Sequence, residues 1–451
     1  MAASPLVFST TTPVRTPINM QSESLSEDLK QAKLSLPLTG KSFDLLLSQQ
    51  LLPDSLNWKY GYGNLDRDAI PETFQPILKR VVNLDDDHAV MEDIIKFTDK
   101  RGLKLQCAEL YCFDNTLGLL RIDFALSSDT LDSTALQRLD LSTIDQAFSV
   151  IAESIYQHVI YPNFLDALHP ISSDLLGSAG RVQCKDPIYS DLDFKLRYNP
   201  EHLLWTGRCL QVCSSSLSEN AKNQFMTWAN CAEKVFFNTG AFQMFIGSGN
   251  YLVFSDNIDT VAKDVFRATA IAQIYSAFMT IYGGVFKSTL RDLLKLEQKK
   301  GFKARMTDSL LTQTARRLEL LNFLKLDFAE ATRSIQGNRK ELVDNFIASW
   351  QINELEKTTC ERANFIRSRL ERITEERKIS QNRTIEMILV SIGGVAVIDF
   401  ALNMSGNAAK LKNDNILGLV DLFRWLSPDV SLWSACALVV MATVYVYHGK
   451  K

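Results

Sequence analysis

Residues 430–447, VSLWSACALVVMATVYVY, form an 18-residue stretch without a formal charge near the C-terminus. An uncharged apolar run of this length reaches the threshold for a membrane-spanning helix. A second apolar stretch, residues 385–404 (IEMILVSIGGVAVIDFALNM), precedes it. This stretch is long enough to span a bilayer if Glu386 lies at the interface and Asp399 is tolerated inside. The two stretches together predict a two-span transmembrane hairpin in residues 384–451.

The charges that flank the hairpin predict its orientation. Six basic residues precede the first stretch and two follow the second, whereas the loop between them balances three basic against three acidic residues. Under the positive-inside rule this places both termini in the cytoplasm and predicts a multi-pass membrane protein. The flanking basic residues are Arg367, Arg369, Arg372, Arg377, Lys378, Arg383, Lys450 and Lys451.

A soluble alternative rests on the length of the first stretch. Its uninterrupted apolar core, residues 387–398, has only 12 residues. A run of that length is more often a buried helix of a soluble domain. The alternative is therefore a soluble helical interaction protein that buries an apolar C-terminal hairpin in its own core.

The region before the hairpin, residues 289–383, has an almost wholly helical pattern. Its apolar residues fall near heptad spacing, with an interruption at Gly337 and Asn338, beside abundant Arg and Glu. This pattern is typical of a coiled-coil-like stalk. We expect the stalk helix to run directly into the first apolar stretch.

Residues 41–288 alternate between helical and strand patterns. Apolar β-rich runs at 105–113 and 117–126, and again at 242–246 and 251–254, are separated by turn residues, which predicts two hairpins. Helical patterns are found at 143–160, 218–232 and 258–285. These elements predict an α+β cytosolic domain with an antiparallel or mixed sheet. Residues 1–40, in which Ser, Thr and Pro are abundant, are expected to be a disordered tail.

Composition and motifs narrow the function classes. A net charge of −3 gives no nucleic-acid signature. Residues 177–180 (GSAG) contain two glycines but are not followed by the lysine of a phosphate-binding loop. The five histidines have no nucleophile at motif spacing. The sequence therefore predicts neither an enzyme nor a bound cofactor.

Three polar residues at the end of the first apolar stretch are candidates to line a pore. An ionisable group inside a span costs several kcal/mol, so Asp399 is expected to face a pore, water or a partner. The alternative is that the span ends at Ile398 and that Asp399 lies at the interface. Asn403 and Asn407 follow on the same stretch. Gly393 and Gly394 predict close packing between the spans, or reflect the higher glycine content of membrane helices.

This order of parts, an α/β cytosolic domain, a long helix, two C-terminal spans and a basic tail, resembles the CorA family of pentameric divalent-cation channels. The likeness is clearest in the last third of the chain. That family has Gly-Met-Asn at the end of its first span, whereas residues 402–407 here read LNMSGN and lack that order. The resemblance implies a homo-oligomer in the lipid membrane that conducts or gates ions, with a divalent cation as the transported ion.

The same order of parts, a cytosolic domain followed by two spans, also resembles membrane effectors of bacterial defence systems. In that alternative the α+β domain is a sensor for a nucleotide, another small molecule or a protein regulator, and the spans permeabilise the membrane. Ligand-dependent toxicity is expected of an effector, and a metal-dependent growth phenotype of a transporter.

Overall fold

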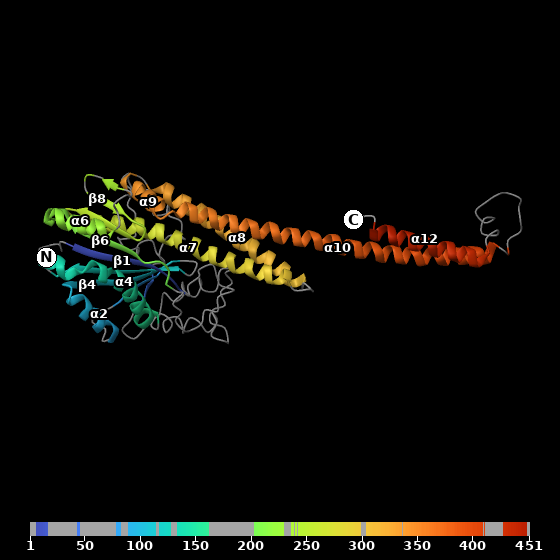
Figure 1. Ribbon diagram of the computed structural model, residues 1–451, viewed down its shortest axis with the longest axis horizontal. Helices are drawn as coiled ribbons and strands as arrows, with labels where there is room; N and C mark the ends of the chain where they lie inside the picture. The colour runs from blue at the N-terminus through green and yellow to red at the C-terminus, as the bar shows by residue number, and fades with distance from the viewer. Residues whose placement is uncertain are drawn as a thin grey trace. The chain divides into compact units, whose positions relative to one another are not determined.

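The computed structural model describes residues 6–16, 43–45, 78–82, 89–113, 117–127, 133–161, 203–229, 236–238, 240, 242–298, 304–335, 337–408, 410 and 427–448 (Figure 1). The chain forms two compact units. The first comprises Met1–Lys300 and Thr312–Ile366, and the second comprises Gly301–Leu311 and Arg367–Lys451.

A mixed sheet organises the first unit. Among the described residues it has nine strands in the order β2-β3-β4-β5-β1-β6-β9-β8-β7. Only the β6–β9 pair is parallel among these. The predicted hairpins are confirmed as β4–β5 and β8–β9. The strands are β1 Leu6–Arg15, β2 Phe43–Leu45, β3 Leu78–Val81, β4 Leu103–Cys112, β5 Leu117–Leu126, β6 Gly207–Cys213, β7 Phe236–Asn238, β8 Phe242–Ile246 and β9 Asn250–Ser255.

The strand at the centre of this sheet, β1, corrects the prediction of a disordered tail. Residues Leu6–Arg15 pair with β5 on one side and with β6 on the other. The abundance of threonine here suggested disorder, but threonine is β-branched and favours extended backbone. The threonines of β1 are buried, and two of their hydroxyls are hydrogen-bonded: Thr12 with Thr206 at 3.0 Å, and Thr10 to the Ile122 carbonyl at 3.4 Å. The backbone carbonyl of Thr11 accepts a hydrogen bond from Gln273 at 3.0 Å. Residues 17–40 lie outside the described residues.

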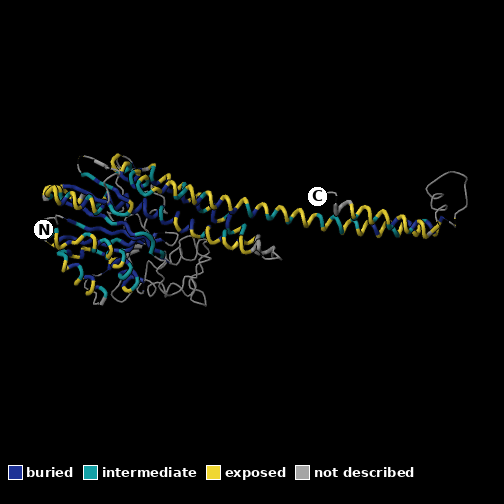
Figure 2. The backbone as a smooth tube through the Cα atoms, viewed as in Figure 1, coloured by how far each residue is buried: buried dark blue, intermediate teal, exposed yellow. Residues whose placement is uncertain are grey.

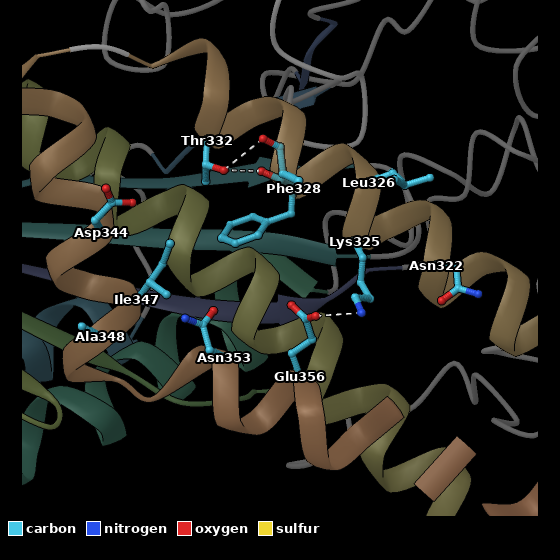
Figure 3. Close-up of a pocket in the computed structure, with 11 residues that line it drawn as sticks. Asn322, Lys325, Leu326, Phe328, Thr332, Asp344, Ile347, Ala348, Asn353 and Glu356 are labelled. Atoms are coloured by element: carbon cyan, nitrogen blue, oxygen red, sulfur yellow. Dashed lines mark hydrogen bonds and ion pairs between the residues drawn. The ribbon is translucent and has the colours of Figure 1, made fainter. Parts of the chain in front are cut away.

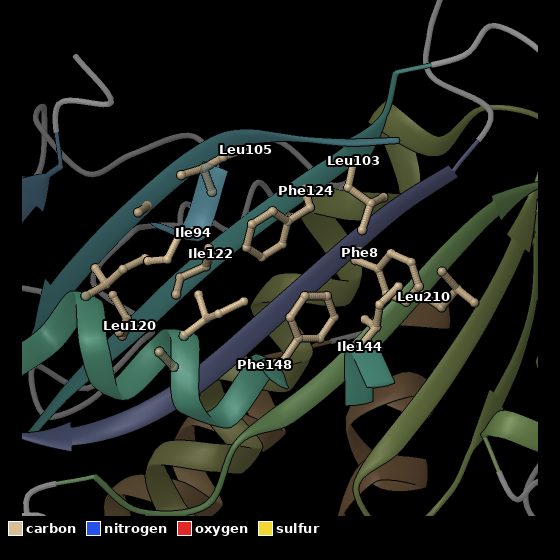
Figure 4. Close-up of a cluster of buried hydrophobic side chains, with 14 of the residues drawn as sticks. Phe8, Ile94, Leu103, Leu105, Leu120, Ile122, Phe124, Ile144, Phe148 and Leu210 are labelled. Atoms are coloured by element: carbon tan, nitrogen blue, oxygen red, sulfur yellow. The ribbon is translucent and has the colours of Figure 1, made fainter. Parts of the chain in front are cut away.

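Among the described residues, four helices cover one face of the sheet, and their apolar side chains form the main core with those of the strands. Phe148 of α4 lies 5.4 Å from Phe8 of β1 and 5.2 Å from Phe124 of β5, measured between ring centroids (Figure 4). Ser218 caps α6 by accepting a hydrogen bond from the Ala221 amide. The helices are α2 Ala89–Asp99, α3 Ser133–Leu139, α4 Leu141–Ile155, continued by the π-helical turn Tyr156–Ile160, and α6 Glu219–Trp228.

The long helix α7, Ile258–Gln298, packs on the opposite face of the sheet. This interface is partly polar, because Arg121 of β5 forms an ion pair with Asp123 at 2.5 Å and lies 4.4 Å from the ring centroid of Phe266. Burial beside Asp123 raises the pKa of the neighbouring Cys107 thiol. The Arg121 guanidinium, held by Asp123 on the same strand, therefore joins the sheet to α7 by a cation–π contact.

Within the first unit, parts of three further described helices pack beside α7. They are α8 Ala304–Ser334, α9 Asn338–Ser349 and α10 Ile352–Ala408. Gly337, with a φ of 63°, precedes α9, so the predicted interruption is confirmed. A second break lies at Gln351, whose φ of 53° is unusual for a residue with a side chain. Residues 312–366, which the sequence assigned to a stalk, belong to the same compact unit as the sheet.

The second unit is mainly a helical hairpin. It contains residues 367–408 of α10 and the antiparallel helix α12, Pro428–His448 (Figure 1). Because α10 is continuous from Ile352 to Ala408, the expected run of the stalk helix into the apolar stretch is confirmed. By length and composition α10 is able to cross a membrane, whereas the apolar part of α12, Asp429–Val444, is shorter.

Candidate functional site

Small side chains lie between the two helices of the hairpin. Gly394 of α10 lies against Val439 of α12: a Cβ atom added at Gly394 would be 2.5 Å from Cγ1 of that valine. The other buried positions along the seam carry Ala or Ser, which lets the backbones approach closely. They are Ala401, Ser405 and Ala408 of α10, and Ser431 and Ala435 of α12.

Large apolar side chains lie on the outside of the same hairpin. Trp433 is 76% exposed, whereas Ala435, two residues later, is 4% exposed. Only 11% of the most apolar 18-residue window of α10 is buried. Figure 2 shows the hairpin mainly in the colour of exposed residues. The exposed set includes Ile388, Leu389, Ile392, Val395, Phe400, Trp433, Leu438, Val440, Met441 and Val444.

The three candidate pore residues share one exposed face of α10. Asp399, Asn403 and Asn407 follow one another at four-residue spacing, and all three are exposed. At 3.6 residues per turn, this face lies roughly opposite the seam formed by Ala401 and Ser405. The structure therefore brings the three polar residues together and leaves them pointing away from α12.

The two candidate packing glycines have different surroundings. Gly394 is buried against Val439, whereas a Cβ atom at Gly393 would meet nothing within 4 Å. The sequence alone does not distinguish the two glycines, because the difference depends on which side of α10 is covered by α12.

A groove in the first unit was not found from the sequence. Its volume is about 780 Å³, and α8, α9 and the start of α10 form its walls (Figure 3). The lining residues are Asn322, Lys325, Leu326, Phe328, Ala329, Thr332, Asp344, Ile347, Ala348, Asn353 and Glu356. They are separated by up to 34 positions and come from three helices, and they follow no motif spacing that would have signalled a site.

A polar network lies at one end of this groove. Glu356 accepts a hydrogen bond from the Tyr275 hydroxyl at 2.5 Å and pairs with the Lys325 ammonium at 2.9 Å. The hydrogen bond to Glu356 raises the pKa of Lys325, and burial, followed by Glu356, raises the pKa of Tyr275. The Tyr275 ring stacks on Phe328 with centroids 3.6 Å apart. The network thus joins α7, α8 and α10.

The side chains of the groove offer groups that can hold a ligand. They include carboxylates, amides, one ammonium and an apolar floor, and Lys325 also approaches the Cys360 sulfur at 3.7 Å. Burial raises the pKa of the Cys360 thiol, which disfavours the nucleophilic thiolate. Within the part of the chain that the structure describes, no three His, Cys, Asp or Glu side chains gather as metal ligands.

Comparison with known proteins gives no protein family, no curated protein and no solved structure that matches this chain.

Proposed function

We propose that this chain is an integral membrane homo-oligomer of CorA-like architecture that conducts or gates ions under the control of its N-terminal α+β unit. In this proposal residues 385–404 of α10 and the apolar part of α12 both cross the bilayer. Both termini lie in the cytoplasm, and a divalent cation is the transported ion.

The arrangement of the α10/α12 hairpin carries the proposal. A helical hairpin of a soluble protein places its large apolar side chains inside and its polar ones outside. This hairpin has Gly394, Ala401 and Ala435 inside, and residues such as Trp433 and Leu438 outside. Small residues at helix contacts and large apolar residues facing outward are typical of helices in lipid.

The polar face of α10 supports the homo-oligomer. Asp399, Asn403 and Asn407 point away from α12, so α12 does not shield them. A carboxylate in contact with lipid chains is costly, and intramembrane acidic residues usually face a water-filled path or a partner. Several copies arranged with this face toward a common axis would surround a path lined by carboxylates and amides, which attracts cations.

The basic segment before the apolar stretch supports the orientation. Arg367 and Arg372 form exposed pairs with Glu371 at 2.8 Å and Glu376 at 3.8 Å, and such pairs contribute little to stability. Arg377, Lys378 and Arg383 follow, all within eight residues of residue 385. A cluster of basic residues beside a span favours the cytoplasmic side of the membrane.

Membrane fractionation followed by flux measurement tests the proposal. We expect the full chain to remain with membranes after a carbonate wash, to be released by detergent as an oligomer, and to admit a divalent cation into liposomes loaded with a fluorescent indicator. Recovery of the chain in the soluble fraction without detergent would refute it. If the chain inserts into liposomes but admits no ions, ion conduction is refuted and only membrane anchoring is supported.

A further inference from the structure

The charge of the groove between α8, α9 and α10 selects the kind of ligand it can hold. Its lining includes one ammonium, Lys325, and two carboxylates, Asp344 and Glu356. The ammonium is already held by Glu356 at 2.9 Å. The lining offers an anion such as a nucleotide phosphate only an ammonium that Glu356 already holds, whereas it offers a cation two carboxylate acceptors.

The two carboxylates lie toward different ends of the groove. Figure 3 draws Asp344 at the end near Thr332, and Glu356 at the end near Lys325. Thr332 and Lys325 are seven residues apart on α8, which corresponds to roughly 10 Å at 1.5 Å per residue. The floor between the two ends is apolar, with Phe328, Ala329 and Ile347.

We propose that this groove binds an elongated organic polycation, an alkyl polyamine. One protonated amine pairs with Asp344, a second pairs with Glu356, and the methylene chain between them packs on the Phe328 and Ile347 side chains. The volume of about 780 Å³ is within the range of small-molecule sites. The amides of Asn322 and Asn353 and the hydroxyl of Thr332 offer further hydrogen-bond acceptors to the amines.

Each end of the groove already holds a lysine in the position of a ligand amine. Lys340 lies 2.7 Å from Asp344, where both side chains are substantially exposed, and Lys325 lies 2.9 Å from Glu356. A polyamine therefore competes with these lysines. Because Glu356 belongs to α10 and also bonds Tyr275 of α7, displacement of Lys325 changes the contacts of α10 within the first unit.

Calorimetric titration of the full chain in detergent with spermidine tests the binding. We expect saturable binding with one spermidine per chain. Asp344→Asn should weaken it about two- to fivefold, as for a partly exposed ion pair. Lys325→Met should strengthen it, because methionine keeps the apolar stem and removes the competing ammonium. Glu341→Gln, an equal charge change on an exposed residue of α9 outside the groove, should leave it unchanged.

Two results would overturn the proposal: no saturable binding at millimolar spermidine, or equal weakening by Asp344→Asn and Glu341→Gln. Circular dichroism of each variant confirms that it is folded. An effect of spermidine on ion flux rests on the proposed function and is measured separately in liposomes. Binding without any flux refutes the proposed function and leaves the polyamine site intact, whereas flux without binding does the reverse.

Discussion

Gly394 of α10 faces Val439 of α12, so that a Cβ atom at the glycine would lie 2.5 Å from Cγ1 and 3.3 Å from Cβ of the valine. Valine is stiff about χ1 and cannot turn its branched end away easily. The close approach of the two helices therefore depends on the missing side chain at Gly394.

Replacing this glycine should weaken the hairpin. Gly394→Val should lower the stability by about 1–3 kcal/mol, the usual cost of overpacking. Gly393→Val is the matched control, since it makes the same change one residue earlier, where a Cβ atom meets nothing within 4 Å. Thermal midpoints of both variants in the same detergent measure the difference. Equal midpoints for the two variants would show that α10 and α12 do not pack through Gly394.

The burial of β1 predicts a large cost for a substitution near the N-terminus. Phe8 is fully buried and lies 5.4 Å from Phe148 and 6.1 Å from Trp228, measured between ring centroids. Phe8→Ala should therefore lower the free energy of unfolding by about 3 kcal/mol. Val7→Ala, a truncation at a half-buried neighbour on the other face of the strand, should cost less. Chemical unfolding followed by circular dichroism compares the two, and an unchanged midpoint for Phe8→Ala would restore the prediction of a disordered tail.

The sequence predicted elements whose signals are local. The β4–β5 hairpin is marked by Asp114, Asn115 and Thr116 between two β-rich runs, and α6 by its Ser218 cap. The place of β1 depends on partners that are far away in the sequence, such as Asp123 and Cys209, which pair with Ser9. No local pattern encodes such pairing, and a strand rich in Ser and Thr resembles a linker in composition.

The candidate sites also differ in how far the sequence alone predicts them. The helical period alone places Asp399, Asn403 and Asn407 on one side of a helix. Which side of α10 meets α12, and hence the difference between Gly393 and Gly394, requires the packed hairpin. The pairing of Lys325 with Glu356 required the packing of α8 against α10, because the two residues follow no motif spacing.

The buried thiol of Cys107 predicts a loss of stability in alkali. Burial, followed by the charge of Asp123, raises the pKa of Cys107 well above its ordinary value of 9.0. Above pH 9.0 the unfolded chain loses this proton while the folded chain retains it, so the free energy of unfolding falls as the pH rises. The slope due to one such group is about 1.4 kcal/mol per pH unit.

Unfolding by urea at several pH values measures this slope. Cys107→Ala should make the fall above pH 9.0 shallower, and it should leave the pH dependence between pH 6 and 8 as in the parent chain, because Cys107 is protonated there in both states. A slope above pH 9.0 that is equal in the two proteins would mean that Cys107 ionises as readily in the folded chain as in the unfolded one.

Asp399 is the residue on which the proposed ion path depends most. If α10 lines a path through the membrane, the carboxylate concentrates cations there. Asp399→Asn keeps the shape and removes the charge, so it should lower cation flux into liposomes while insertion and oligomer size stay the same. Asp399→Leu should stop the flux, because it replaces the carboxylate by an apolar group.

The position of Asn403 provides a compensation test. It lies one turn from Asp399 on the same exposed face of α10, so Asn403→Asp returns a carboxylate to this face. The double variant Asp399→Asn/Asn403→Asp should therefore recover much of the flux that Asp399→Asn loses. A general effect on folding or incorporation would not be reversed by a second substitution.

If Asp399 lies instead at the membrane interface, water is an adequate partner for its carboxylate, and the Asn and Leu variants should both conduct as the parent chain does. Unaltered flux in both, at matched protein incorporation, would remove Asp399 and its face from the ion path.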